Sequence, residues 1–198
     1  MALFSREYER LSDERLLELI ARGDERAFGA VYDRYQHRLL NYFHRMLWHD
    51  RERARDMVQD LFAKLARKPE SYDASRPFST WVFSVANNMC KNAYRHNEVV
   101  RAAANHMRYE PDRVEALDGV GVDHDLFRDR LSMELDRIDP DHKATFVMRY
   151  HEDMAIKEIA AAFGCSEGTV KSRLFYTLKK LAERMKEFDP NALHHGKA

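Results

Sequence analysis

Histidine and cysteine are the residue types in this chain that could hold a metal ion or form a covalent intermediate. The 198 residues include 10 histidines and 2 cysteines, Cys90 and Cys165. His37 and His44 fall on one face of an expected helix, but no H-x-x-x-H, H-E-x-x-H or C-x-x-C spacing occurs. The sequence also has no Gly-rich phosphate loop and no nucleophile elbow. We therefore expect no enzyme activity, no bound metal and no cofactor.

Side chains suited to nucleic acid occur instead within residues 155–182. Two apolar helical patterns follow each other closely there, and Gly164 can supply the positive φ that ends the first helix. Ser166 is a good N-cap for the second helix. The expected inner faces are Ile156, Ile159, Ala160 and Phe163 in the first helix, and Val170, Leu174, Leu178 and Leu181 in the second. This order predicts a helix-turn-helix.

The outward face of the second helix carries hydrogen-bond donors. Lys171 and Ser172 lie in its first turns, where a recognition helix reaches base edges in the major groove. Their donors suit purine acceptors or phosphate, and Thr169 with the free backbone N–H groups suits a phosphate. The alternative is an ordinary antiparallel helix pair with a solvated basic face. The spacing favours DNA binding but does not define the DNA sequence.

Charge is distributed unevenly although the net charge is zero. Residues 76–108 carry a net charge of +4 and residues 166–198 a net charge of +3, and residues 109–165, with −7, lie between them. Phosphate binding responds to local charge, so two separate contacts with DNA are compatible with this distribution.

Helical periodicity fills the chain before residue 97. Ser12 and Asp24 are expected N-caps, Gly23 is an expected stop, and Pro77 suits the first turn of a fourth helix. The periodicity is lost over 97–125, which has Pro and Gly among scattered acids and therefore indicates a flexible linker, and it returns at Leu126. We predict an all-α protein of two helical domains, 1–96 and 126–187, joined by a linker at 97–125 and followed by a tail at 188–198.

Neither a signal peptide nor a membrane span is indicated. The first residues contain no sustained apolar stretch, and no run approaches 18 apolar residues. We expect a cytoplasmic protein whose chain does not insert into a membrane.

Five motifs resemble the sigma factors of bacterial RNA polymerase. The N-terminal half is similar to their region two at Gly23–Phe28, Asp56–Phe62 and Arg76–Trp81. The C-terminal half is similar to region four at Phe146–Tyr150 and at the two parts of the helix-turn-helix, Ile156–Ala160 and Gly168–Leu174. The resemblance covers roughly 12–96 and 127–186. A chain with only these two regions resembles the extracytoplasmic-function (ECF) type of sigma factor.

The resemblance implies a partner for the third helix. Its Asp56, Gln59, Asp60 and Phe62 match the segment that docks on the β′ clamp helices of core RNA polymerase. The three polar residues are spaced i, i+3 and i+4, so they share one face and can accept hydrogen bonds from arginines. A solvated acidic face beside a core Phe62 is the alternative.

The resemblance also implies two DNA contacts. The residues that match the part opening the minus-ten element are Tyr72, Asn88, Lys91, Asn92 and Arg95. Lys171, Ser172 and Tyr176 match base-reading positions for the minus-thirty-five element, and Arg149, Thr169 and Arg173 match its backbone contacts. Trp81 and Phe78 are expected in the core because they repeat with helical spacing.

Three departures from the family pattern concern details of these contacts. Asp153 and Ala155 replace the commoner Gly and Ser or Thr, so Asp153 is expected to cap the first helix of the helix-turn-helix. Tyr176 stands where Arg is frequent, which changes the base preference expected there. Met89 and Cys90 replace a smaller pair in region two.

The leading hypothesis is an alternative sigma factor that binds core RNA polymerase, including its β flap, and directs promoter-specific initiation. Promoter DNA and an anti-sigma factor are the other expected partners. The second hypothesis is a stand-alone helix-turn-helix regulator, which leaves the acidic segment at 56–62 without a role. A metal-dependent enzyme is the third, and the histidine spacing disfavours it.

Overall fold

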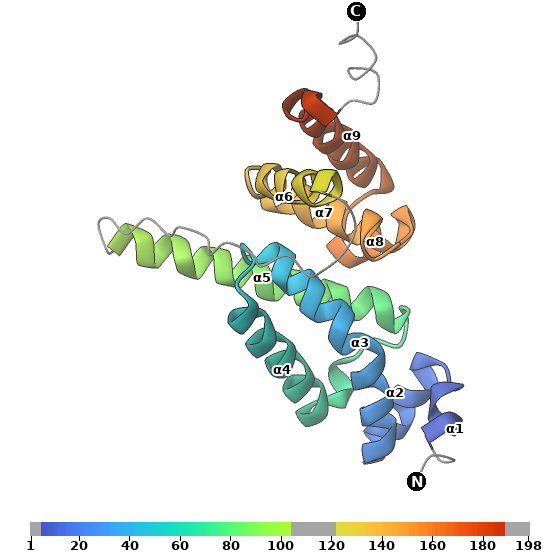
Figure 1. Ribbon diagram of the computed structural model, residues 1–198. Helices are drawn as coiled ribbons and strands as arrows, with labels where there is room; N and C mark the ends of the chain where they lie inside the picture. Colours follow the sequence, from blue (N-terminus) through green and yellow to red (C-terminus); the bar gives the residue numbers. More distant parts are fainter. Residues whose placement is uncertain (1–4, 104–121, 189–198) are drawn as a thin grey trace, which may run out of the picture. The chain divides into compact units, whose positions relative to one another are not determined.

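The computed structural model describes residues 5–103 and 122–188, and its regular structure there is helical throughout (Figure 1). The chain divides into two compact units, the first containing α1–α5 and the second α6–α9. The prediction of an all-α fold with two helical domains is confirmed. None of the described helices has the length and apolarity of a membrane span.

The first unit is built around helix α3. Its elements are α1 (Ser5–Glu9), α2 (Asp13–Ala21), α3 (Glu25–Met46), α4 (Arg51–Arg67), the 3-10 turn η1 (Pro69–Ser71) and α5 (Phe78–Ala103). Helix α3 packs against α2, α4 and α5. Buried side chains recur along it with helical spacing, so α3 forms the centre of this unit.

Local capping explains where the early helices begin. Ser12 Oγ accepts from the Arg15 backbone N–H at 3.2 Å, and an Asp24 carboxylate oxygen accepts from two N–H groups in the first turn of α3. Gly23 between them has φ +86°, a conformation that favours glycine. The predicted caps and stop are therefore confirmed.

The second unit holds the predicted helix-turn-helix. Its helices are α6 (Val122–Asp136), α7 (Pro140–Tyr150), α8 (Ile156–Phe163) and α9 (Glu167–Arg184), followed by the 3-10 turn η2 (Lys186–Phe188). Helix α9 packs against α6, α7 and α8. A small core between α6, α7 and α9 contains Leu135, Ile138, Phe146, Leu181 and Met185.

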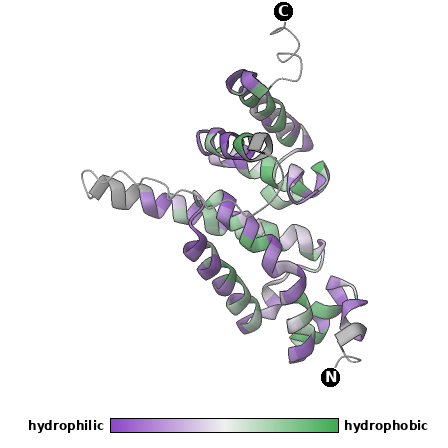
Figure 2. Cartoon of the chain, in the orientation of Figure 1, coloured by the Kyte–Doolittle hydropathy of each residue, from purple (hydrophilic) through white to green (hydrophobic). Residues whose placement is uncertain are grey.

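Hydrophobic residues line the inner sides of the helices in each unit. Figure 2 shows this on α4, where hydrophilic residues run along one edge and hydrophobic residues along the edge that faces α3. The buried set on α4 is Ala54, Val58, Leu61, Phe62 and Leu65. The opposite edge is therefore left to solvent or to a partner.

Three expectations about helix ends and faces are corrected. Helix α5 continues to Ala103, seven residues into the expected linker, and most of that linker, 104–121, lies outside the described residues. Asp153 has φ +52° and does not cap α8; instead Glu158 accepts from the Ala155 N–H at 2.7 Å. The inner face of α9 uses Thr177, whereas Leu178 is 43% exposed.

The end of the chain differs slightly from the expected tail. Phe188, predicted as its first residue, belongs to η2 and packs its ring against Phe127 with centroids 5.3 Å apart. Residues 189–198 lie outside the described part of the chain.

Candidate nucleic-acid interface

Helix α9 presents a polar face on the side opposite its buried residues. We call Thr169, Lys171, Ser172 and Tyr176 the recognition face, and all four are exposed. Gly164 ends α8 with φ +63°, and Ser166 Oγ accepts from the Thr169 N–H at 3.1 Å to begin α9. The turn therefore has the stop and the cap that the sequence predicts. Within α9 the Ser172 hydroxyl donates to the Gly168 carbonyl at 2.9 Å.

Two arginines expected to contact the DNA backbone are engaged inside the unit. Arg173 pairs with Asp141 at the start of α7 at 3.0 Å, and its guanidinium lies 5.5 Å from the Phe163 ring centroid. Arg149 donates to the Met154 carbonyl at 3.1 Å, across the turn between α7 and α8. Both side chains are only partly exposed, so they hold α7, α8 and α9 together in this structure.

Helix α5 presents the second polar face. We call Asn88, Lys91, Asn92 and Arg95 the α5 stripe, because spacings of three and four residues place them on one side. Asn88, Asn92 and Arg95 are exposed and Lys91 is partly exposed. Amide groups that can donate and accept lie here beside two cations, a combination suited to unpaired bases and their phosphates.

Tyr72 lies apart from the α5 stripe in an aromatic cluster. Its ring is 5.5 Å from Phe78 and 5.7 Å from Trp81, both of which are buried as predicted. Its hydroxyl donates to the Arg76 carbonyl at 2.8 Å. Burial, with a further contribution from the carboxylates of Glu14 and Asp13, raises the pKa of Tyr72. The Tyr72 ring is therefore partly buried in this cluster, and its contact with the minus-ten element stays a prediction.

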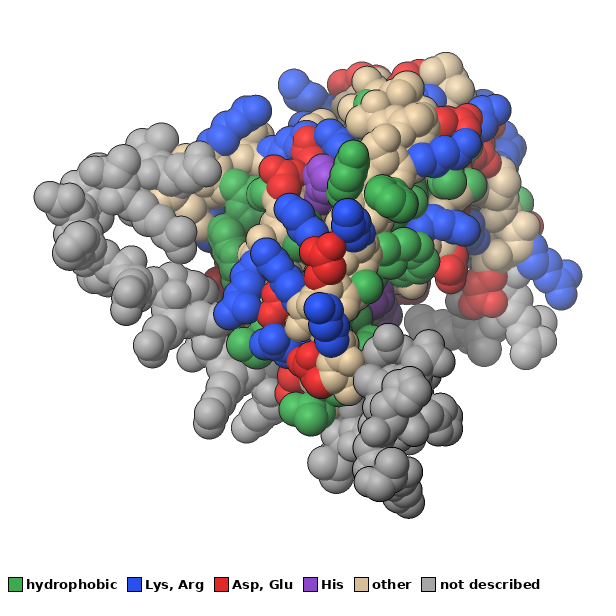
Figure 3. Space-filling model, turned by 90° about the horizontal axis from the view of Figure 1, so that it is seen from above, with side chains coloured by type: hydrophobic (Ala, Val, Ile, Leu, Met, Phe, Trp, Pro, Cys, Tyr) green, Lys and Arg blue, Asp and Glu red, His purple; other side chains and the backbone are tan. Residues whose placement is uncertain are grey.

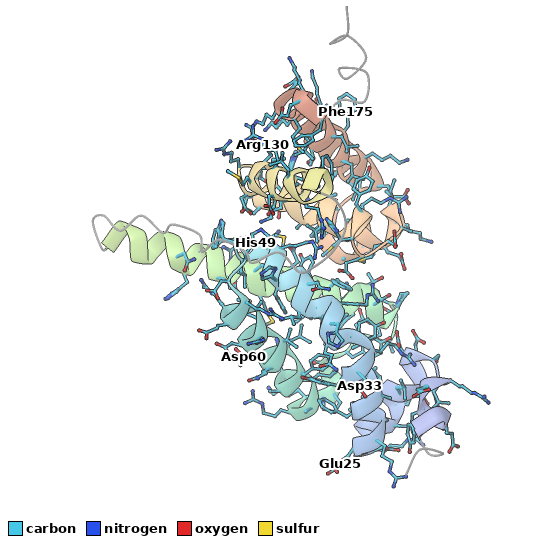
Figure 4. All side chains as sticks on the ribbon, in the orientation of Figure 1. Glu25, Asp33, His49, Asp60, Arg130 and Phe175 are labelled. Carbon is cyan, nitrogen blue, oxygen red and sulfur yellow. The ribbon has the colours of Figure 1, made fainter. Side chains whose placement is uncertain are left out.

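Helix α4 carries the acidic face. Asp56, Gln59 and Asp60 are all exposed, and Figure 4 shows Asp60 on the side of α4 away from α3. Among the described residues, neither carboxylate takes part in an ion pair or side-chain hydrogen bond. We call these three residues the α4 face, and they can accept hydrogen bonds from cations of a partner.

Phe62 does not belong to that face. It is 2% exposed, with its ring centroid 4.7 Å from that of Tyr32 and 6.1 Å from that of Phe28. In this structure Phe62 is a core residue beneath the acidic face, as the alternative has it, and its contact with the β′ clamp helices stays a prediction. Its burial depends on α3, which pattern matching along α4 alone does not include.

The structure adds residues that the motifs did not indicate. Glu52 is exposed one turn before Asp56 and extends the α4 face, a position that i, i+4 spacing could have revealed. Phe175 is 62% exposed beside Tyr176, with ring centroids 5.5 Å apart. Figure 4 shows it projecting from α9.

Surface charge is mixed on the side drawn in Figure 3. On the side drawn in Figure 3, Lys and Arg side chains alternate with Asp and Glu, and hydrophobic side chains are exposed among them. The described residues contain no group of three or more His, Cys, Asp or Glu that could hold a metal ion. Individual polar faces, and not a global field, must therefore provide the contacts.

Comparison with known families shows the family of the chain. The family described as "Sigma-70 region 2" matches residues 31–100, and "Sigma-70, region 4" matches residues 135–183. The first match contains the α4 face and the α5 stripe, and the second contains the recognition face. Together they cover more than half of the chain, which belongs to the sigma-70 family of RNA polymerase sigma factors.

Relatives place the chain among the ECF sigma factors. It is 29% identical over 181 residues to the ECF RNA polymerase sigma-E factor of Haemophilus influenzae, covering 84% of this chain and 92% of that protein. It is 28% identical over 172 residues to the RNA polymerase sigma-H factor of Pseudomonas aeruginosa, covering 82% and 88%. It is therefore an alternative sigma factor, the subunit that binds core RNA polymerase and directs promoter-specific initiation.

Two solved structures share the fold. CnrH, solved in complex with the cytosolic domain of CnrY, has a TM-score of 0.67 and 23% identity, covering 89% of this chain and 99% of that chain. The sigma factor RpoE of Bartonella quintana, solved with the anti-sigma factor NepR, has a TM-score of 0.71 and 19% identity, covering 82% and 98%.

Proposed function

We propose that this sigma factor docks on polymerase through the α4 face and contacts the promoter at two points, the α5 stripe and the recognition face. The observation that carries the proposal is the separation of the three faces onto three different helices, each exposed on one side and packed on the other. The three contacts can therefore form at the same time.

Docking would use the carboxylates of α4. Asp56 and Asp60 face outward without an ion pair among the described residues, while Phe62 anchors the helix from beneath. Arginines on the β′ clamp helices are the partner we propose, because paired cations on a facing helix match carboxylates at this spacing. Large apolar side chains exposed on the second unit, including Leu126 and Met133, support a further protein contact there, for which we propose the β flap.

Promoter contact would be divided between the units. The recognition face would bind the minus-thirty-five element as duplex, since donors at the start of an exposed helix reach base edges in the major groove. The α5 stripe would hold unpaired bases of the minus-ten element. We assign residues 1–96, with the rest of α5, to polymerase docking and the minus-ten element, and residues 126–187 to the minus-thirty-five element. The part of 97–125 that lies outside α5 and α6 is assigned to a linker.

We also propose a regulatory partner and a location for this sigma factor. An anti-sigma factor is proposed as a regulator, since RpoE, which shares the fold, was solved with the anti-sigma factor NepR. The cytoplasm is the proposed location because polymerase and promoter are there. We propose that this chain catalyses no reaction itself during initiation.

Transcription with purified core RNA polymerase tests the docking step. Asp56→Asn combined with Gln59→Ala should abolish core binding and promoter-dependent transcript while leaving duplex binding by α9 in place. Glu25→Gln, an exposed acidic position at the start of α3, is the matched control and should transcribe normally.

The same variants decide the second candidate function. A stand-alone regulator would bind its DNA without polymerase, and the α4 substitutions would leave its activity unchanged. Failure of the unmodified chain to bind core polymerase or to yield any promoter-dependent transcript would overturn the sigma-factor proposal.

A further inference from the structure

The recognition helix begins with an acidic side chain. Glu167 is the first residue of α9 and is exposed. From there to Glu183, every exposed charged side chain on α9 is basic, namely Lys171, Lys179 and Lys180. A carboxylate at the leading end of a helix that enters DNA is therefore a departure from the rest of its surface.

Glu167 is not used inside the protein. Ser166 already caps the helix, and its hydroxyl also lies 3.0 Å from the Thr169 hydroxyl. Among the described residues, no hydrogen bond or ion pair involves the Glu167 carboxylate. The neighbouring Gly168 carries no side chain, and a Cβ built there would meet only Ser166 Oγ, at 3.5 Å. The first turn around Glu167 is therefore open for close approach.

Geometry directs the side chain toward the groove. The Cα–Cβ bonds of a helix tilt toward its N-terminus, so Glu167 projects ahead of the helix. In a helix-turn-helix that end of the recognition helix contacts base edges. The Glu167 carboxylate therefore precedes Lys171 and Ser172 along the same helix, about one turn away.

Electrostatics restricts what a carboxylate can accept there. Phosphates repel it, so close contact with DNA is favourable for a carboxylate only where it meets a hydrogen-bond donor. In the major groove the donors are the amino groups of cytosine and adenine. Adenine places the N7 acceptor beside its amino group, and that acceptor would face the second carboxylate oxygen. Cytosine has no acceptor at the corresponding edge and is therefore the better match.

We infer that Glu167 is a specificity-determining residue, which accepts a hydrogen bond from the N4 amino group of one cytosine in the upstream promoter element. The inference rests on the proposed function of the recognition face. The competing role is purely structural: a carboxylate in the first turn also stabilises the helix dipole. That role acts on every DNA sequence equally, so base preference separates the two.

Selection from a randomised promoter library by the complete holoenzyme tests the inference. The unmodified chain should enrich cytosine at one position of the upstream element. Glu167→Ala should reduce that preference about tenfold while other positions keep theirs, because Lys171 and Ser172 are unchanged. Glu167→Gln should move the preference toward adenine, which an amide can bind through both N6 and N7.

Glu183→Gln, an exposed glutamate on the last turns of the same helix, is the matched control and should leave every preference unchanged. Unchanged preferences in both Glu167 variants, or an equal weakening at all positions, would overturn the inference. If the unmodified holoenzyme enriches no sequence at all, the proposed function of the recognition face fails instead.

Discussion

The helices that face DNA in the two units are supported differently. Helix α5 rests on aromatic rings: Phe78 packs 5.1 Å from Tyr35, and Phe83 packs 5.5 Å from Tyr42, measured between centroids. Helix α9 also has a small apolar core, but ion pairs tie it to its neighbours. The first unit should therefore depend mainly on apolar packing and the second on packing together with charge.

The charge network of the second unit centres on one buried carboxylate. Glu134 on α6 is 1% exposed and pairs with Arg130, Arg137 and Arg184 at 3.3, 2.8 and 3.3 Å. Arg130 also reaches Glu187 at 3.2 Å, and Figure 4 shows it on α6. Such pairs weaken with salt, whereas ring packing does not. Removing one partner of a buried pair leaves the other charge uncompensated.

The largest expected effect is a loss of packing in the first unit. Phe83→Ala should lower the free energy of unfolding of this unit by about 4 kcal/mol, since it empties a fully buried aromatic site. The only tryptophans, Trp48 and Trp81, both belong to the first unit, so tryptophan fluorescence during denaturant unfolding isolates it. Asn92→Ala on the exposed side of α5 is the control. An equal loss in both variants would contradict the packing account.

The next effect concerns the buried carboxylate. Glu134→Gln should lower the free energy of unfolding of the second unit by about 2 kcal/mol, because it removes the buried charge that one partly exposed and two exposed arginines share. It should also make that unit less sensitive to salt, as followed by circular dichroism. Glu183→Gln is the control in the same unit. A salt dependence unchanged by Glu134→Gln would contradict the account.

Local helix caps and long-range ion pairs differ in how far the sequence predicts them. Caps and stops such as Ser12, Gly164 and Ser166 are predictable because their partners lie within a few residues along the chain. The pairing of Arg173 with Asp141 spans 32 residues and depends on how α7 meets α9. Family motifs therefore indicated a DNA contact for Arg173, and only the tertiary structure shows its internal partner.

The C-terminal end of α5 is also poorly predicted from the sequence. Apolar periodicity fades after residue 97, yet α5 continues to Ala103. Periodicity reports which face is buried and not whether the backbone stays helical, and residues 98–103 contain no Gly or Pro to stop it. The exposure of polar residues such as Asp56 and Asn92 follows from the sequence pattern, whereas the burial of Phe62 and the partial burial of Tyr72 depend on neighbours in other helices.

Substitutions of Asp141 and Arg173, with a smaller expected effect, test whether Arg173 positions α9 or contacts DNA. Asp141→Asn should destabilise the second unit by about 1 kcal/mol and lower its affinity for duplex promoter DNA, because it releases Arg173. Arg173→Gln should have a similar effect on both quantities. If Arg173 instead binds phosphate directly, Arg173→Gln alone would weaken binding and reduce its salt dependence, and Asp141→Asn would strengthen it.

The smallest effect is a pH dependence of the first unit. Burial, followed by the nearby Arg45 and Arg51, lowers the pKa of His44. Below the unfolded value of about 6.5 the unfolded chain then binds more protons than the folded one, so stability present above that pH is lost as pH falls through this window. Tryptophan-detected unfolding at neutral and mildly acidic pH should show this loss, and His44→Gln should reduce it. The same loss in both proteins would assign the dependence to other groups.

Opening of promoter DNA tests the central claim, a two-point contact with separate duplex and single-strand roles. With holoenzyme, permanganate reactivity of unpaired thymines reports melting, and footprinting reports duplex binding. Asn88→Ala with Asn92→Ala should abolish melting while the upstream footprint remains. Lys171→Ala with Ser172→Ala should abolish the upstream footprint, yet retain binding to a promoter whose minus-ten element is already unpaired. Equal loss of footprint and melting in both variants, on both templates, would contradict the account.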